Sequence, residues 1–301
     1  MPAKYDLAAA NATPRPATGR AYPYLFMHFP LRFFALRPAL AAALLLRLAG
    51  PGQAQTPASL PPVGSDTLRP AAPPPLAAAA GCAHPFGLRV GQNVEYQLLD
   101  ARGRATGSWR YRVVSLRTDT TGKKKKRVET TKAQLKSGLY DLTNRVLQQQ
   151  DLTVVCRRDT TYTDGLAEIN YEGLKSFRDR LLAYRGTPLA WPNAPAAGTR
   201  LPDGGATVQV SSPSVAIAQV NTRLRQRRVL AGPAPVTVPA GTFRCYAVES
   251  VRELATAARA DLVLKSSGRQ VDYYDPAAGI VKTEFYDKAG KLTQSRVLAK
   301  H

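Results

Sequence analysis

Histidine and cysteine are scarce in this chain, and their scarcity limits the chemistry that it can carry. The 301 residues include 3 His and 3 Cys. His28 lies in the leader predicted below, His84 follows a proline-rich segment and His301 is the last residue. A His-based triad and a three-His metal site are therefore effectively excluded. No C-x-x-C pair is present, so we expect neither a metal ion nor another cofactor.

Recognisable catalytic motifs are missing as well. The sequence has no G-x-S-x-G elbow, no P-loop and no G-x-G-x-x-G after a strand. Carboxylates are sparse, and Asp272, Asp275, Glu284 and Asp287 each fit a strand surface or the start of a turn. We therefore expect no catalytic residues. A hydrolase would require clustered acids or an activated serine in a pocket.

Residues 1–54 are predicted to be an export leader. Its second half, 27–54, has a positive segment with Arg32, an apolar run too short to span a bilayer and small residues up to Ala54. This pattern is typical of a secretory signal peptide with cleavage after Ala54. An apolar helix on a membrane surface is the alternative. We expect Met27 to be the natural start.

Residues 55–81 are rich in Pro and Ala and predict an extended linker. One β-rich domain is expected to follow over 82–301. The sequence before Cys82 looks like a lipoprotein cleavage box, but no adequate apolar run precedes it, so lipidation is the less favoured alternative. We expect the product in the periplasm, or outside the cell, of a Gram-negative bacterium.

An oxidising compartment allows one disulfide among three cysteines. We expect it to join Cys82 and Cys156, closing a loop of about seventy residues worth ~4 kcal/mol in the chain-entropy model. Cys245 shares one face of a predicted strand with Phe243 and Ala247. It is expected to be a small buried core residue.

Period-two alternation of apolar and polar residues predicts strands. Val94 and Tyr96 alternate with polar neighbours, and so do Trp109 and Tyr111. The fold class expected is α+β and mostly antiparallel β, a curved sheet or half-open barrel with one amphipathic helix packed on it.

One turn pattern occurs three times, at 100–103, 141–144 and 287–290. An Asp opens each turn, and Gly or Asn stands three residues later, where positive φ is easiest. The copies are too few and too unevenly spaced for a solenoid or propeller, so they predict hairpins of a meander.

One segment, 172–184, predicts the helix. Asn170 is a plausible N-cap, and Leu174, Phe177 and Leu181 follow at helical spacing. We expect about three turns packed over the sheet. The apolar stripe could instead line a ligand cavity.

Basic residues outnumber acidic ones, 42 to 21. Residues 55–301 carry 36 Lys and Arg against 20 Asp and Glu, a formal net charge of +16. Such a charge favours polyanions, although generic basicity on solvated strand faces is the preferred explanation. The run 123–127 is expected at a hairpin tip, and no aromatic residue interleaves it, so no specific nucleic-acid binding is expected.

Two sets of residues are candidates for binding. Arg223, Arg225 and Arg227 are predicted to share one exposed strand face, where they could contact a polyanion or protect an edge strand. The aromatic candidates for a ligand-facing surface are Trp109, Tyr111 and Tyr273, with core packing as the default. Tyr273 and Tyr274 are adjacent and must point to opposite faces of the sheet.

Three C-terminal motifs point to a family: residues 238–246, VPAGTFRCY; residues 274–282, YDPAAGIVK; and residues 285–292, FYDKAGKL. Together they resemble the TapB-like family of exported bacterial proteins, and the likeness extends over residues 82–300. The resemblance implies a domain of unknown function with a strongly curved antiparallel sheet, crossed by a helix, like lipoprotein carriers with an apolar concavity. It implies no catalytic residues.

We therefore expect an exported, non-enzymatic envelope protein of unknown function, acting as a monomer. Its concave face could hold an apolar or lipid-like ligand. The alternative is a basic surface module that binds polyanions such as lipopolysaccharide or acidic polysaccharide. A hydrolase is the third and least favoured hypothesis.

Overall fold

The structure is a computed structural model that describes residues 82–123, 127–259 and 262–301. The predicted leader and linker, and residues 124–126 of the basic run, lie outside the described residues. The predictions made for these segments stay predictions.

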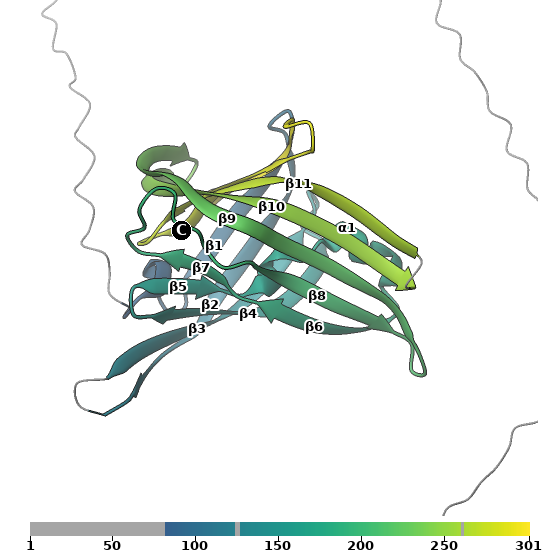
Figure 1. Cartoon of the computed structure of the whole chain (residues 1–301), viewed down its shortest axis with the longest axis horizontal. Coiled ribbons are helices and arrows are strands. Elements are labelled where there is room, and N and C mark those ends of the chain that lie inside the picture. Colours follow the sequence, from purple (N-terminus) through teal and green to yellow (C-terminus); the bar gives the residue numbers. More distant parts are fainter. Residues whose placement is uncertain (1–81, 124–126, 260–261) are drawn as a thin grey trace, which may run out of the picture. The chain divides into compact units, whose positions relative to one another are not determined.

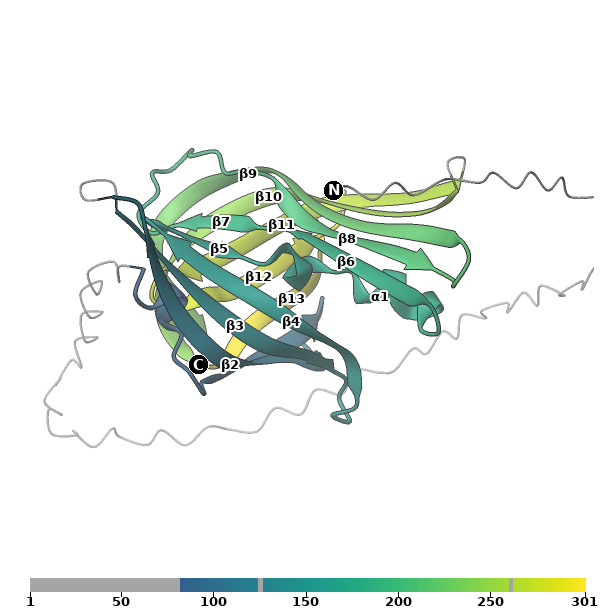
Figure 2. The same cartoon turned by 90° about the horizontal axis from the view of Figure 1, so that it is seen from below.

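One antiparallel sheet of 13 strands curves into a nearly closed barrel (Figures 1 and 2). Its strands are β1 (Asn93–Asp100), β2 (Ala105–Thr121), β3 (Val128–Tyr140), β4 (Val146–Arg157), β5 (Thr160–Thr163), β6 (Leu181–Thr187), β7 (Leu189–Pro192), β8 (Gly204–Ser211), β9 (Ala216–Val238), β10 (Gly241–Arg259), β11 (Leu262–Asp275), β12 (Gly279–Tyr286) and β13 (Leu292–Lys300). The helical elements are η1 (Pro85–Gly87), η3 (Gly165–Glu168), α1 (Tyr171–Leu174) and η4 (Lys175–Phe177).

The strand order explains the closure. It runs β6-β8-β9-β10-β11-β12-β13-β1-β2-β3-β4-β5-β7. Most neighbours are sequential hairpins, and β13 pairs with β1. The two edge strands, β6 and β7, are consecutive in the chain and are separated by Pro188 alone. The predicted curved sheet or half-open barrel is confirmed.

The predicted helix over 172–184 is wrong in its extent. It begins as predicted, since α1 follows Asn170, but it gives way to the 3₁₀ turn η4. Residues from Leu181 onward form β6 and pair with β8. The helical spacing gave the wrong element because Leu174, Phe177 and Leu182 do pack in one apolar cluster. They reach it from helical turns and from strand β6, not from one continuous helix.

The barrel interior is filled with side chains. Trp191, Leu224, Tyr274 and Leu298 are among the fully buried residues. The small cavity beside Tyr96 has a volume of about 40 Å³, far below the roughly 300–1,000 Å³ of typical ligand sites. Among the described residues, this interior cavity is therefore too small for the lipid-like ligand that the sequence and the family resemblance suggested.

The three predicted turns fold alike. In each, one carboxylate oxygen of the opening Asp accepts the backbone N–H groups two and four residues later. The fourth residue has positive φ, 74° at Gly103, 59° at Asn144 and 77° at Gly290. The sequence pattern thus predicted both the position and the conformation of these turns.

The cysteines divide as the sequence suggested. Cys82 and Cys156 form a disulfide that ties the segment before η1 to β4, with Cα atoms 5.1 Å apart. Cys245 is a buried free thiol in the core. Burial raises the pKa of the Cys245 thiol to about 12, so the thiol stays protonated and unreactive at neutral pH.

Candidate functional site

A short turn carries an acid into the barrel. Asp164 caps η3 by accepting the backbone N–H of Leu166 at 3.0 Å. Gly165 packs so tightly that a Cβ there would collide with the carbonyl oxygens of Thr187 and Gly205. This close approach to β6 and β8 positions Glu168, at the end of the turn, as a buried residue.

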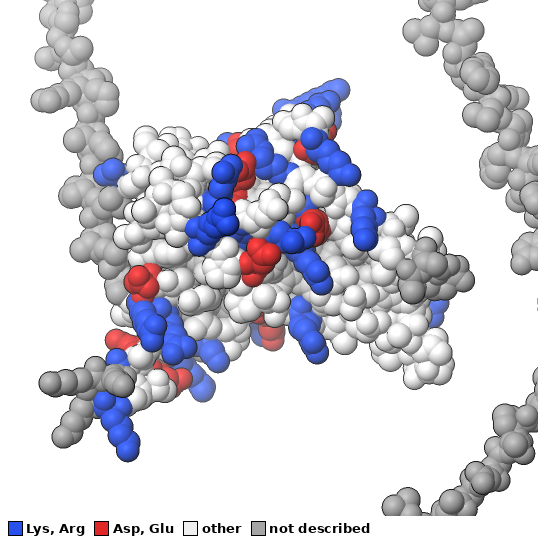
Figure 3. Space-filling view, in the orientation of Figure 1, with Lys and Arg blue, Asp and Glu red and all other residues white. Residues whose placement is uncertain are grey.

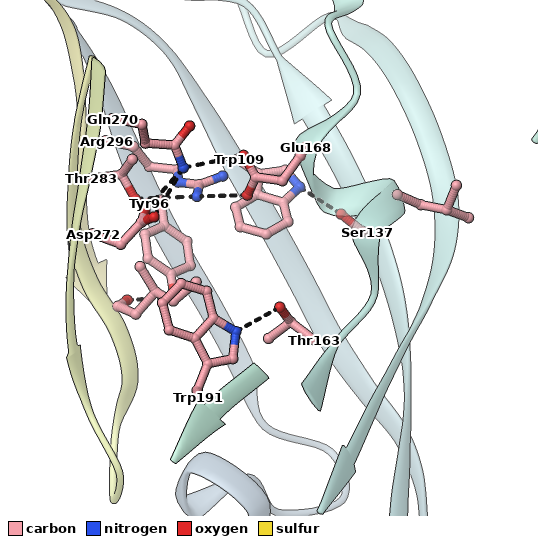
Figure 4. Close-up of polar contacts among 12 residues, drawn as sticks. Tyr96, Trp109, Ser137, Thr163, Glu168, Trp191, Gln270, Asp272, Thr283 and Arg296 are labelled. Atoms are coloured by element: carbon pink, nitrogen blue, oxygen red, sulfur yellow. Dashed lines mark hydrogen bonds and ion pairs between the residues drawn. The ribbon is translucent and has the colours of Figure 1, made fainter. Parts of the chain in front are cut away.

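Glu168 belongs to an interior polar cluster with Gln270, Asp272, Thr283 and Arg296 (Figure 4). Gln270 Nε2 donates to Asp272 Oδ2 at 3.0 Å and to Glu168 Oε2 at 3.4 Å. Thr283 Oγ1 donates to Asp272 Oδ1 at 2.8 Å. Arg296 Nη2 lies 3.6 Å from Glu168 Oε1 and donates to Thr283 Oγ1 at 3.2 Å. Two carboxyl groups and one guanidinium therefore share a site away from water.

The cluster shifts the titration of Asp272. Burial, and after it the charge of Glu168, raise the pKa of this carboxyl to about 6, although Arg296 and the hydrogen bonds from Thr283 and Gln270 lower it. The sequence interpretation of Asp272 as a surface or turn residue was wrong. Asp272 lies on the inward face of β11, together with the fully buried Gln270 and Tyr274.

The aromatic candidates separate into two faces. Trp109 and Tyr111 pack with Tyr96 inside the barrel, with ring centroids 5.2–6.1 Å apart. The Arg296 guanidinium lies 4.8 Å from the Trp109 ring centroid, and Trp109 Nε1 donates to Ser137 Oγ at 2.6 Å (Figure 4).

Tyr273 does not join them. Its hydroxyl donates to Glu284 Oε2 at 3.1 Å, and Lys282 lies 5.7 Å from its ring. Because neighbours along a strand point to opposite faces, Tyr273 is outside where Tyr274 is inside. Its selection as a residue of the concave face is corrected.

The predicted arginine row is also interrupted. Arg223 and Arg225 are exposed, but Arg227 is 1% exposed. Gln226 has a φ of 53°, and the β9–β10 register shifts beside it. This bulge reverses the alternation, so the prediction that Arg227 shares the exposed face was wrong.

Buried Arg227 is held by the barrel wall. Its Nη2 donates to the Ala190 carbonyl at 3.0 Å, its Nη1 donates to the Pro202 carbonyl at 3.1 Å, and its guanidinium stacks 4.6 Å from the Trp191 ring centroid. Burial lowers the pKa of Arg227 to about 10. It is a structural cation that a polyanion cannot reach.

Exposed arginines on this face are largely paired with acids. Arg225 Nη1 lies 3.2 Å from Glu253 Oε1, and Arg228 and Arg269 share Glu249 at 2.8 and 3.3 Å. In the space-filling view, basic and acidic side chains accordingly lie side by side (Figure 3). The local charge is therefore lower than the composition suggested.

An open cleft of about 550 Å³ lies at one mouth of the barrel. We call it the mouth cleft, and its lining includes Leu98, Asp100, Trp109, Leu139, Leu147, Glu168, Glu172, Arg252, Phe285 and Arg296. Trp109, Glu168 and Arg296 also border the small interior cavity. They form the partition between the open cleft and the filled barrel.

Sequence reasoning missed Glu168, Arg252 and Arg296. A signal existed for Arg296, which alternates with the core residue Leu298 along β13 and therefore shares its face. Glu168 lies in an irregular segment, where no period predicts direction.

The described part of the chain shows neither a metal-binding group nor a membrane-spanning helix. Its acidic, His and Cys side chains make no group of three that could hold a metal ion. Within the same residues, no helix has the length and hydropathy needed to cross a bilayer.

Comparison with known families places the chain. A family model described as DUF3108-like matches residues 89–298. The chain belongs to this family. No curated protein matches it. The family model thus shows the DUF3108-like family, and the finer TapB-like assignment stays a prediction.

Two solved structures resemble this DUF3108-like protein. One is a candidate lipoprotein from Parabacteroides distasonis, with a TM-score of 0.59 and 19% identity over 73% of this chain and 98% of that one. The other is a candidate exported protein with a YmcC-like fold from Bacteroides fragilis, with a TM-score of 0.52 and 18% identity over 73% and 99%. At such identity the likeness establishes the fold.

Proposed function

We propose that this DUF3108-like chain is an exported, non-enzymatic protein of the bacterial cell envelope that binds an amphiphilic molecule in its mouth cleft. The leader pattern supports export, as does the Cys82–Cys156 disulfide, which needs an oxidising compartment. Both solved relatives are described as exported or lipoprotein candidates. A Gram-negative periplasm is the location we favour.

The mouth cleft carries the binding proposal. Its volume of about 550 Å³ lies within the range of roughly 300–1,000 Å³ typical of ligand sites. Aromatic and aliphatic side chains line it beside a few charged groups. Because side chains fill the barrel interior, we assign the apolar ligand expected from the sequence to this open cleft.

The carboxyl pair supports a non-enzymatic role. Asp272 accepts hydrogen bonds from Thr283 and Gln270, and Glu168 is engaged by Gln270 and Arg296. Asp272 does not line the mouth cleft. Glu168 does line the cleft, but Gln270 and Arg296 engage its carboxylate, so we assign the pair the role of holding η3 to the sheet rather than that of a general acid or base.

Adjacent residues of β4 provide the test. Leu147 lines the mouth cleft, whereas its neighbour Val146 is 46% exposed and does not. Decanol should bind saturably to the wild type and change its tryptophan fluorescence, because Trp109 lines the cleft. Leu147→Glu should abolish this binding, and Val146→Glu should retain it. No saturable binding to the wild type, or equal binding by both variants, would refute the proposal.

A polyanion-binding surface is the alternative proposal, supported by the net charge of +16 over residues 55–301. Arg225 and Arg228 on β9 are already paired with acids, so β9 is a poor contact surface for a polyanion. The described ends of the basic run, Lys123 and Arg127, are exposed. Heparin or lipopolysaccharide binding should weaken between low and physiological salt. Binding that is insensitive to salt would contradict it.

A further inference from the structure

Arg252 reaches the mouth cleft from β10. It pairs across the sheet with Leu224, which is fully buried on the inward face, so Arg252 also points inward. Its guanidinium lies 5.1 Å from the Phe285 ring centroid. Both side chains line the mouth cleft.

Arg252 differs from the other two inward arginines. Arg227 donates to two carbonyl groups, and Arg296 contacts Glu168 and Thr283. The described residues give Arg252 no ion pair and no hydrogen bond, and its Nε is buried without a partner. Burial lowers the pKa of Arg252, and the negative charge of Glu168 partly opposes this shift. The guanidinium nevertheless stays protonated at neutral pH.

An unpaired charge held partly out of water is unfavourable, and an anion placed against it recovers that cost. We propose that the mouth cleft binds a monoanionic amphiphile, whose carboxylate pairs with Arg252 and whose apolar tail lies along Leu98, Leu139 and Leu147. This inference rests on the proposed function and adds the charge and the anchoring residue.

The surroundings select a single negative charge. Asp100, Glu168 and Glu172 also line the mouth cleft, and although each has a basic partner, further negative charges on a ligand would lie close to these carboxylates. The planar guanidinium presents a fork of N–H donors that matches a carboxylate. The guanidinium packs over the Phe285 ring, a contact that favours a cation and restrains the Arg252 side chain.

Two probes with the same tail length measure the contribution of the charge. Decanoate and decanol are titrated into the mature protein at neutral pH and low salt, below micelle formation. Decanoate should bind at least tenfold more tightly than decanol. Arg252→Gln should remove this preference while decanol binding persists. Arg225→Gln, an exposed arginine of neighbouring β9, is the matched control and should keep the preference.

The outcomes separate this inference from the proposed function. Equal wild-type affinity for decanoate and decanol overturns the anion site and leaves the amphiphile cleft intact. Failure of both probes overturns both. A third arm uses vesicles containing phosphatidylglycerol: binding to vesicles without binding of decanoate overturns the inference, and binding of decanoate alone identifies a free carboxylate as the ligand. The wild-type comparison holds even if Arg252→Gln fails to fold.

Discussion

At the scale of single residues, Arg225 and Arg227 show how two like side chains on one strand acquire different roles. Arg225 is exposed and ion-paired, whereas Arg227 fills the barrel wall beside Trp191. Arg227→Ala leaves the carbonyl groups of Ala190 and Pro202 without donors and opens a cavity. We expect the free energy of unfolding to fall by about 3 kcal/mol.

Urea unfolding measures this difference. Arg225→Ala, the matched control, should change stability by less than about 0.5 kcal/mol, since an exposed ion pair contributes little. Equal losses for the two variants would show that Arg227 is not the structural cation described.

Asp272 makes a prediction about pH. Its folded-state pKa of about 6 lies above the ordinary 3.8, so the folded state retains a proton that the unfolded state releases. The stabilisation is fully present below about pH 4 and is lost as pH rises through 6, by at most ~3 kcal/mol. Asp272→Asn should flatten this decline in the free energy of unfolding.

Comparing the wild type with Asp272→Asn separates the contribution of Asp272 from that of His301. Burial lowers the pKa of His301, so His301 makes the free energy of unfolding rise with pH in the same range. Asp100→Asn is a control, because Arg104 lowers the pKa of Asp100, and its contribution is lost only as pH falls below about 4. An unchanged profile for Asp272→Asn would contradict the prediction.

These residues also mark how far sequence reasoning reached. Alternation correctly placed Trp109 and Tyr111 inside. It failed at Arg227 because a bulge adds a residue to one strand and reverses every side chain beyond it. It missed Asp272 because a buried acid and a solvent-facing acid look alike without their cross-strand partners.

At the scale of elements, the repeated turns make the clearest prediction. Asp287 holds its turn by accepting the N–H groups of Ala289 and Lys291 at 2.9 Å each. Asp287→Ala should cost about 1 kcal/mol, while Asp287→Asn retains an acceptor and should restore most of it. Thermal unfolding compares them, with Lys288→Ala as a neutral control. A loss as large in Asp287→Asn as in Asp287→Ala would refute this role.

The helix and the turns show why some elements could be predicted and others could not. An Asp-x-x-Gly turn is stabilised within five residues, so a local pattern suffices. Residues 181–184 were part of the predicted helix but begin β6, since β8 supplies backbone partners along the whole strand. Such long-range pairing cannot be read from a local window.

At the scale of the whole molecule, the disulfide joins residues 74 apart in sequence. Its removal by Cys82→Ser with Cys156→Ser should lower the free energy of unfolding by about 4 kcal/mol, because the unfolded chain gains freedom. Chemical denaturation of both forms measures this. Cys245→Ala replaces the buried free thiol and serves as a control that retains the bridge. Equal stability with and without the bridge would count against this role.

The pairing of β1 with β13 bears on how the chain acquires its structure. Tyr96 lies opposite Leu298, so nearly the whole domain separates two strands that must meet. Until β13 has been synthesised, β1 and β12 each keep an unpaired edge. Contacts so distant in sequence form slowly. A nascent chain of this topology therefore stays incompletely folded until its last strand emerges, and threading across a membrane requires such an unfolded chain.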